Sequence, residues 1–381
     1  MITKKNELSQ DKKVISSNRV KALDTARGYA TIMMVIGHYI QWYLKSIAPT
    51  SFLPDIAPPS ILHFIFVSLL GISAQNLFVT LPAMGIIFQQ NLYKQRNIDE
   101  KLLRKSVLKR GLLLILIQFF CNVLFSDPGY TWTWFILSFI GVSIIIAYFI
   151  SKYSLYVRIT IVIIIIILSP FLKYHFYSAF LSLFFYKNSW SIETFFYKMC
   201  LQVVFPIFPS IIYPIIGTIY AEKIIEAKET NSQYELIRNS LICGVILVSA
   251  FFLLGNIYSV INYPDFWFNL PSRLDVLYVF GTNLIILSIF YWIQDWQEKS
   301  WKIFEPFRVF GAISLTVFIT HFYLFPKFID RILYPGARQS TDFYTIMQFS
   351  LVLIILYYIY GLYVLRNNRK YSVEWLLRSF I

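Results

Sequence analysis

Residues 159–168 read I-T-I-V-I-I-I-I-I-L, an apolar run without a charged side chain. With its flanks, the run reaches the length of about 20 residues that a helix needs to cross a hydrocarbon core about 30 Å thick. Comparable runs occur at 241–260 and 349–365. The strands of a membrane barrel alternate in polarity over about ten residues, whereas these runs are continuously apolar. The sequence therefore predicts a polytopic integral membrane protein built of α-helices.

The composition supports this interpretation along the whole chain. Of the 381 residues, 57% are hydrophobic and 14% are charged, whereas a soluble domain carries about 25% charged residues. We expect an all-α bundle of about ten transmembrane helices within 28–366, flanked by an N-terminal tail (1–27) and a C-terminal tail (367–381). The predicted spans are 28–46, 73–92, 109–126, 132–150, 157–173, 201–222, 241–260, 275–294, 309–329 and 344–365.

The net charge of +14 is better explained by membrane topology than by nucleic-acid binding. The basic residues lie in short blocks between apolar runs and form no basic and aromatic platform, so we expect no nucleic-acid partner. Most of the 34 Lys and Arg residues fall on one side of the ten-span arrangement. By the positive-inside rule that side is the cytoplasm, where we expect both termini, and the membrane is expected to be the plasma membrane. The three cysteines are isolated and odd in number, so we expect neither a disulfide framework nor a metal site.

Ionisable residues inside a membrane span are expensive and are candidates for function. The first span and its approach contain Asp24, Arg27 and His38. Arg27 and His38 are eleven residues apart, which on a helix is three turns, so both lie on one face about 16 Å apart along the axis. Burial keeps an imidazole neutral, the state that a general base requires. The alternative is that His38 only hydrogen-bonds across the bundle, while Asp24 caps the helix and Arg27 extends toward the headgroups.

A second pair of candidates lies in the ninth predicted span. Ser314 and His321 are seven residues apart and fall on the same helix face. They could line an acceptor pocket, or His321 could assist His38 if the two spans are neighbours. The alternative is a histidine that is satisfied within the core. We expect Gln118, Asn122, Asn256 and Asn283, inside the predicted spans, to make hydrogen bonds between helices.

Three motifs resemble a known family. The run R-V-K-A-L-D-x-x-R-G-x-A…G-H at 19–38 is similar to the opening of the polytopic membrane acyltransferases called acyltransferase family 3. Residues 311–321 resemble the penultimate helix of that superfamily. Residues 373–378, V-E-W-L-L-R, resemble the ending of its YeiB-like and heparan-glucosaminide acetyltransferase-like branches, although Ser372 and Val373 replace the Gly-Pro that is common in the YeiB-like ending.

The resemblance implies transfer of an acyl group, usually acetyl, from acyl-CoA to a hydroxyl or amine of a cell-envelope glycan or lipid-linked sugar. It implies that His38 is the catalytic base or the acyl-accepting residue and that Arg27 helps to bind the donor. From their helix faces we expect Asp24, Ser314 and His321 to be supporting residues. Acyl-CoA is expected as a co-substrate and no tightly bound cofactor or metal is expected. Further basic residues could meet the donor phosphates: Lys94, Arg96, Arg104, Lys105, Lys109 and Arg110. The alternative for this block is a loop that only obeys the positive-inside rule.

A transporter or flippase for an envelope glycan precursor is the rival from another class, because a basic bundle with a membrane histidine also suits proton-coupled export. The sequence lacks the repeated halves with corresponding broken helices that are typical of transporters. A purely structural or sensory protein would account for the bundle, but not for Arg27 and His38 on one helix face.

Overall fold

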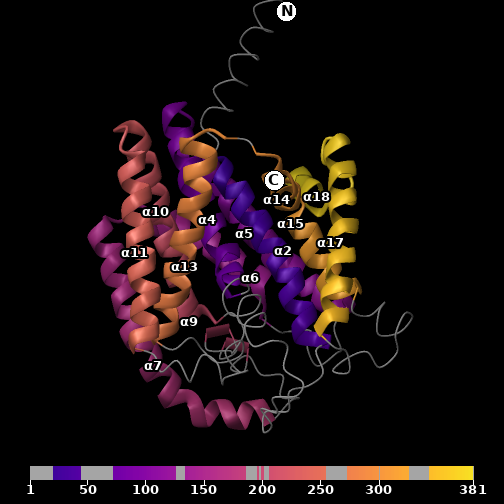
Figure 1. The fold of residues 1–381 in the computed structure, drawn as a ribbon. Helices are drawn as coiled ribbons and strands as arrows, with labels where there is room; N and C mark the ends of the chain where they lie inside the picture. Colours follow the sequence, from indigo (N-terminus) through magenta and orange to yellow (C-terminus); the bar gives the residue numbers. More distant parts are fainter. Residues whose placement is uncertain are drawn as a thin grey trace, which may run out of the picture.

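The computed structural model describes residues 20–43, 72–125, 134–185, 195–196, 199–200, 206–254, 273–299, 301–325 and 343–380. Within these residues every regular element is a helix (Figure 1), which confirms the predicted all-α class. The α-helices are α2 (Lys21–Tyr43), α4 (Ile72–Gln95), α5 (Glu100–Phe125), α6 (Ile136–Ile150), α7 (Leu155–Phe185), α9 (Ile207–Ser210), α10 (Ile212–Glu229), α11 (Gln233–Leu254), α13 (Arg273–Tyr291), α14 (Glu305–Ala312), α15 (Ser314–Ile319), α17 (Phe343–Arg366) and α18 (Val373–Phe380). Short turns of other helix types are η4 (Trp292–Trp296), η5 (Lys302–Phe304) and η6 (Thr320–Leu324).

Fewer helices than predicted are long and apolar enough to cross a membrane. Among the described residues four qualify, and a fifth does if the bent pair Lys302–Ala312 and Ser314–Leu324 counts as one span. The prediction of about ten spans is therefore not supported. It counted every apolar run, although α6 has only 15 residues and α2 mixes its apolar residues with polar and charged ones, so that its mean hydropathy is too low. The four spans are Glu100–Phe125, Gln233–Leu253, Val276–Trp296 and Phe343–Arg366.

Three boundaries also differ from the prediction. The first helix begins at Lys21, so part of the predicted N-terminal tail is helical, while residues 1–19 lie outside the described residues. Helix α7 continues to Phe185 through a segment that we expected to be a connection. The predicted C-terminal tail contains α18. In each case polar or aromatic residues hid a helical continuation, because hydropathy reports burial in lipid and not helicity itself.

Glycines lie where helices cross most closely. A Cβ atom on Gly28 of α2 would lie 1.6 Å from the carbonyl oxygen of Phe307, and one on Gly311 of α14 would lie 2.2 Å from that of Asp24. The backbones of α2 and α14 are therefore in direct contact, as in small-residue crossings of membrane helices. Similar close contacts pair Gly111 with Gly141, Gly244 with Gly281, and Gly217 with Thr80.

The N-terminus of α2 is capped by a residue far along the chain. The backbone N–H groups of Lys21 and Ala22 donate to the two carboxylate oxygens of Asp295, at 2.9 and 2.8 Å. The hydroxyl of Thr25 donates to the side-chain oxygen of Gln294 at 2.8 Å. A carboxylate satisfies the first N–H groups of a helix and complements its dipole, so η4 fixes where α2 starts.

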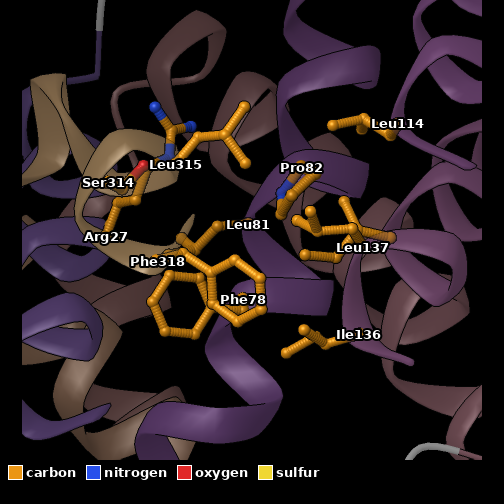
Figure 2. A pocket seen from close by; sticks show the side chains of 11 residues that line it. Arg27, Phe78, Leu81, Pro82, Leu114, Ile136, Leu137, Ser314, Leu315 and Phe318 are labelled. Atoms are coloured by element: carbon orange, nitrogen blue, oxygen red, sulfur yellow. The ribbon is translucent and has the colours of Figure 1, made fainter. Parts of the chain in front are cut away.

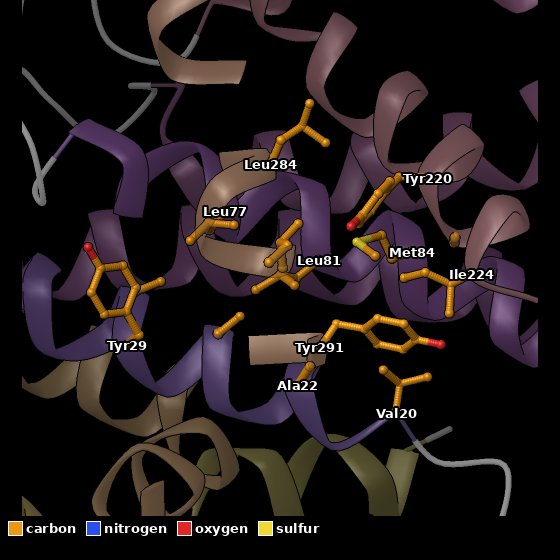
Figure 3. Close-up of a cluster of buried hydrophobic side chains, with 14 of the residues drawn as sticks. Val20, Ala22, Tyr29, Leu77, Leu81, Met84, Tyr220, Ile224, Leu284 and Tyr291 are labelled. Carbon is orange, nitrogen blue, oxygen red and sulfur yellow. The ribbon is translucent and has the colours of Figure 1, made fainter. Parts of the chain in front are cut away.

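The main apolar cluster surrounds the same helix. Side chains from α2, α4, α10 and α13 meet in it, including Tyr29, Leu81, Tyr220 and Tyr291 (Figure 3). In Figure 1, α2 crosses the middle of the bundle, with α11 and α13 on one side and α17 on the other. Its central place means that a side chain on α2 can reach several partner helices.

The helix that carries His321 is broken. At Ile313 the backbone leaves helical geometry (φ −120°, ψ 22°), and the segments before and after the break are bent by 69°. The break leaves N–H groups without helical partners, and Glu374 of α18 accepts hydrogen bonds from the backbone of Leu315 (2.6 Å) and Thr316 (3.2 Å) and from the Thr316 hydroxyl (2.6 Å). A carboxylate from the C-terminal helix thus caps the second half of the broken helix.

We expect Gly28→Ala to lower the midpoint of thermal unfolding in detergent by about 1–4 °C, because the added Cβ must push α14 away and overpacking costs about 1–3 kcal/mol. Gly85→Ala in α4 is the matched control, since its Cβ would meet nothing within 4 Å and alanine favours a helix. A midpoint unchanged in Gly28→Ala would contradict the close crossing.

Candidate active site

The structure brings His38 and His321 into direct contact. Nδ1 of His38 lies 2.8 Å from Nε2 of His321, and the ring planes are 9° apart. His321 is fully buried, whereas His38 is half-buried. The condition that we set from the sequence, that the first and ninth predicted spans be neighbours, is therefore met by α2 and η6.

The hydrogen bonds determine which nitrogens carry protons in the neutral pair. Nδ1 of His321 lies 2.7 Å from the backbone oxygen of Val317, which can only accept, so Nδ1 of His321 is the donor. Nε2 of His321 is then an acceptor, and Nδ1 of His38 must donate to it. This leaves Nε2 of His38 with a lone pair. An imidazole in this tautomer can accept a proton or attack an electrophile.

Aromatic side chains hold the two imidazoles in place. Trp42, one turn after His38 on α2, stacks on it with ring centroids 5.0 Å apart. Phe322 meets His38 edge-on at 5.5 Å, and Phe318 meets His321 edge-on at 5.9 Å. The sequence analysis missed these three residues. Their spacing from the histidines was the available signal, but aromatic residues are common throughout the chain.

A buried polar network fixes η6 from the other side. The amide nitrogen of Gln118 donates to Asn122 at 2.9 Å, and the Tyr323 hydroxyl donates to Asn122 at 3.0 Å. The side-chain oxygen of Gln118 accepts from the backbone N–H of Leu137 at 3.2 Å. The predicted interhelical hydrogen bonds of Gln118 and Asn122 are therefore confirmed, and they hold the residue two positions after His321. Asn256 lies outside the described residues, and the buried side-chain oxygen of Asn283 has no hydrogen-bond partner within them.

Arg27 lies at a small cavity between α2, α4, α5, α6 and α15. Its guanidinium is 3.7 Å from the carboxylate of Asp24. Figure 2 shows Arg27 and Ser314 together at one side of the cavity, which has a volume of about 120 Å³. The other lining residues are Phe78, Leu81, Pro82, Leu114, Ile136, Leu137, Ile140, Leu315 and Phe318. The cavity thus offers a cation and a hydroxyl against an apolar wall.

Phe318 connects the two groups of candidate residues. It lines the cavity beside Arg27 and also packs against His321. The five predicted residues thus form two clusters on either side of this ring, with Asp24, Arg27 and Ser314 in one and the two histidines in the other. Such an arrangement can bind an anion at one end and exchange a proton at the other.

The basic residues that follow the second predicted span are divided between surface and interior. Arg110 is half-buried on α5 and donates to the side-chain oxygen of Gln89 on α4. It lies one turn before Leu114, which lines the Arg27 cavity. The other five side chains are exposed around the α4–α5 turn: Lys94, Arg96, Arg104, Lys105 and Lys109. Within the described part of the chain, no three His, Cys, Asp or Glu side chains gather as a metal site.

The described residues thus form a helical bundle with several apolar spans and a pair of histidines at its central helix. Residues 19–251 match a family model described as the heparan-alpha-glucosaminide N-acetyltransferase catalytic domain. The chain belongs to this family, which indicates a membrane acetyltransferase-type function. The match supports the heparan-glucosaminide branch of the resemblance and not acyltransferase family 3 itself, and neither it nor the described structure supports a transporter. A search of curated proteins finds none that matches this chain. His321 and Ser314 lie beyond the matched residues, so their relation to His38 comes from the structure alone.

We expect nitrogen NMR of ¹⁵N-histidine-labelled protein at neutral pH to show a protonated Nδ1 and an unprotonated Nε2 for both His38 and His321, because the Val317 carbonyl dictates the direction of the hydrogen bonds. The chain has four histidines, so the signals lost in His38→Gln and in His321→Gln assign the pair. An Nε2–H tautomer at His321 would contradict the proposed direction.

Proposed function

We propose that this protein transfers an acyl group, most simply acetyl, from acyl-CoA to a hydroxyl or amine of a cell-envelope glycan or lipid-linked sugar. The observation that carries the proposal is the hydrogen-bonded chain from the Val317 carbonyl through His321 to His38, which leaves a lone pair on Nε2 of His38. Family membership supports the acetyltransferase class. The identity of the donor and the nature of the acceptor are part of the proposal.

In the reaction that we propose, the acceptor oxygen or nitrogen attacks the carbonyl carbon of the thioester, and its proton passes to Nε2 of His38. The resulting imidazolium is stabilised because its Nδ1–H donates to the lone pair of His321, in the way that a carboxylate orients the histidine of a hydrolase triad. The C–S bond then breaks, and the departing thiolate takes the proton from His38. The products are the acylated acceptor and free coenzyme A, and His38 is neutral again.

The donor would bind from the Arg27 end. Arg27 is available for charge-assisted contacts with a phosphate, and Arg110 lies one turn from the cavity lining. Arg27 and His38 are separated by about 16 Å along α2, a gap that the pantetheine arm between the phosphates and the thioester of coenzyme A would cross. The apolar wall beside Phe318 suits this uncharged arm.

The orientation in the membrane is also a proposal. By the positive-inside rule the Arg27 end, with the basic α4–α5 turn, faces the cytoplasm, as do both termini. Acyl-CoA then enters from the cytoplasm and the acceptor reaches His38 from the opposite side of a plasma membrane. The helices α2, α4, α6, α7 and α10, added to the four apolar spans and the bent pair, would complete a bundle of about ten membrane-embedded helices around the site.

We expect His38→Ala to lower acetyl transfer from acetyl-CoA to an envelope extract by about 10²–10⁴-fold, the usual contribution of a general base. His38→Gln retains hydrogen bonding but accepts no proton, so it should be nearly as inactive. Thr282→Val is the control, because Thr282 is a buried residue of α13 whose hydroxyl donates to the backbone oxygens of Tyr278 and Val279. The assay is transfer of radiolabel by purified, monodisperse protein. Activity of His38→Gln above about a tenth of wild type would refute a base role.

Arg27 is tested separately by binding of coenzyme A. Arg27→Ala should weaken binding by about tenfold or more, and Arg27→Lys should recover only part of it, because lysine keeps the charge but loses the planar fork. Arg238→Ala on α11 removes the same charge from an exposed site and should bind normally. Calorimetric titration gives the affinities. If all three variants bind coenzyme A as tightly as the wild type, Arg27 does not contact the donor. Its interaction is then the ion pair with Asp24.

A further inference from the structure

We propose that α18 lies on an anionic phospholipid surface and anchors the C-terminal end of the protein there as an interfacial helix. The outer face of α18 contacts the lipid headgroups at the level where the α17 span ends. This inference concerns lipid binding and does not depend on the proposed acyl transfer.

The two sides of α18 differ in their contacts. At 100° per residue, Val373, Glu374 and Leu377 fall within an arc of about 100°, and all three are partly buried. This inner side faces the protein, since Glu374 accepts the hydrogen bonds of α15 and the backbone N–H of Val373 donates to the Thr316 hydroxyl at 2.8 Å. The inner side is therefore fixed to the broken helix.

The outer side carries three large apolar side chains that the described residues leave largely exposed, beside Arg378 and Ser379. Trp375 is 42% exposed, Leu376 is 48% exposed and Phe380 is 63% exposed. Helix α18 has eight residues, and three large apolar side chains lie on its exposed face. Surfaces that face water rarely expose such a group of apolar side chains. Tryptophan in particular is enriched at the level of the lipid headgroups.

The position in the chain identifies the occupant as lipid. Helix α17 is one of the four helices that are long and apolar enough to cross a membrane, and only residues 367–372 separate its end from α18. Figure 1 shows α18 beside one end of α17. A helix so close to the end of a span must lie near the headgroup layer, where an amphipathic helix binds by inserting its apolar face.

The charges select anionic headgroups. Arg366, Lys370 and Arg378 are exposed at the end of α17, in the connecting turn and on α18 itself. From residue 366 to the C-terminus the one acidic residue is Glu374, whose carboxylate is engaged by α15. The exposed charge of this segment is therefore positive, and it attracts acidic lipids.

The experiment measures contact between Trp375 and lipid in the full-length protein, reconstituted in nanodiscs. Acyl-chain-brominated lipids quench nearby tryptophan, and the difference between wild type and Trp375→Phe isolates Trp375 from the other eight tryptophans. Discs contain equal fractions of phosphatidylglycerol and phosphatidylcholine, with one or the other brominated. We expect brominated phosphatidylglycerol to quench Trp375 at least twice as strongly as brominated phosphatidylcholine.

Two sets of variants separate apolar insertion from charge. The double variant Leu376→Glu and Phe380→Glu should lose most quenching by both lipids, whereas Leu102→Glu, at an exposed apolar site on α5, should not. The double variant Lys370→Gln and Arg378→Gln should bring the quenching ratio of the two lipids to one, whereas Lys101→Gln with Lys105→Gln should leave it unchanged. Absence of quenching in wild type, or equal quenching by the two lipids, would overturn the proposal. Protection of Trp375 by dimerisation through α18 would overturn it as well.

Discussion

The contact between the backbones of α2 and α14 at Gly28 and Gly311 is the constraint on which the site depends. With no side chain at either position, the two helices approach until the carbonyl oxygens of one meet the Cα atoms of the other. This approach sets Arg27, next to Gly28, near Ser314, three residues after Gly311. It also fixes the direction in which the broken helix leaves the crossing, and therefore where His321 arrives beside His38.

Beyond the crossing, two helix ends of the site are capped by carboxylates from distant parts of the chain, and one imidazole is oriented by a carbonyl one turn away on its own segment. Asp295 caps α2, Glu374 caps α15, and the Val317 carbonyl orients His321. In a medium of low dielectric constant an unpaired polar group is costly, so such bonds specify one arrangement strongly. These hydrogen bonds use both ring nitrogens of His321 and Nδ1 of His38. The lone pair on Nε2 of His38 takes no part in them.

The sequence predicted the local part of the site and missed the part that depends on tertiary contacts. The eleven-residue spacing was enough to put Arg27 and His38 on one face of α2, because a helix has a fixed period. The pairing with His321 remained a condition, since no pattern in one sequence states which helices are neighbours. The sequence shows where the glycines are, but it does not show which helix each of them contacts. The number of spans was overestimated because α6 has only 15 residues, and because α2 is long enough but too polar on average to count as a simple span.

The capping of α2 by Asp295 bears on how the protein is made. The ribosome delivers α2 among the first segments, when the residue that satisfies its first N–H groups is still more than 270 positions from being synthesised. His321 and Glu374 emerge later still. During synthesis α2 therefore precedes the residues that cap its N-terminus and pair with its histidine, so the first N–H groups of α2 and Nδ1 of His38 need other partners until those residues follow. A chain that stops before α14 would keep the family's matched residues and yet have no assembled site.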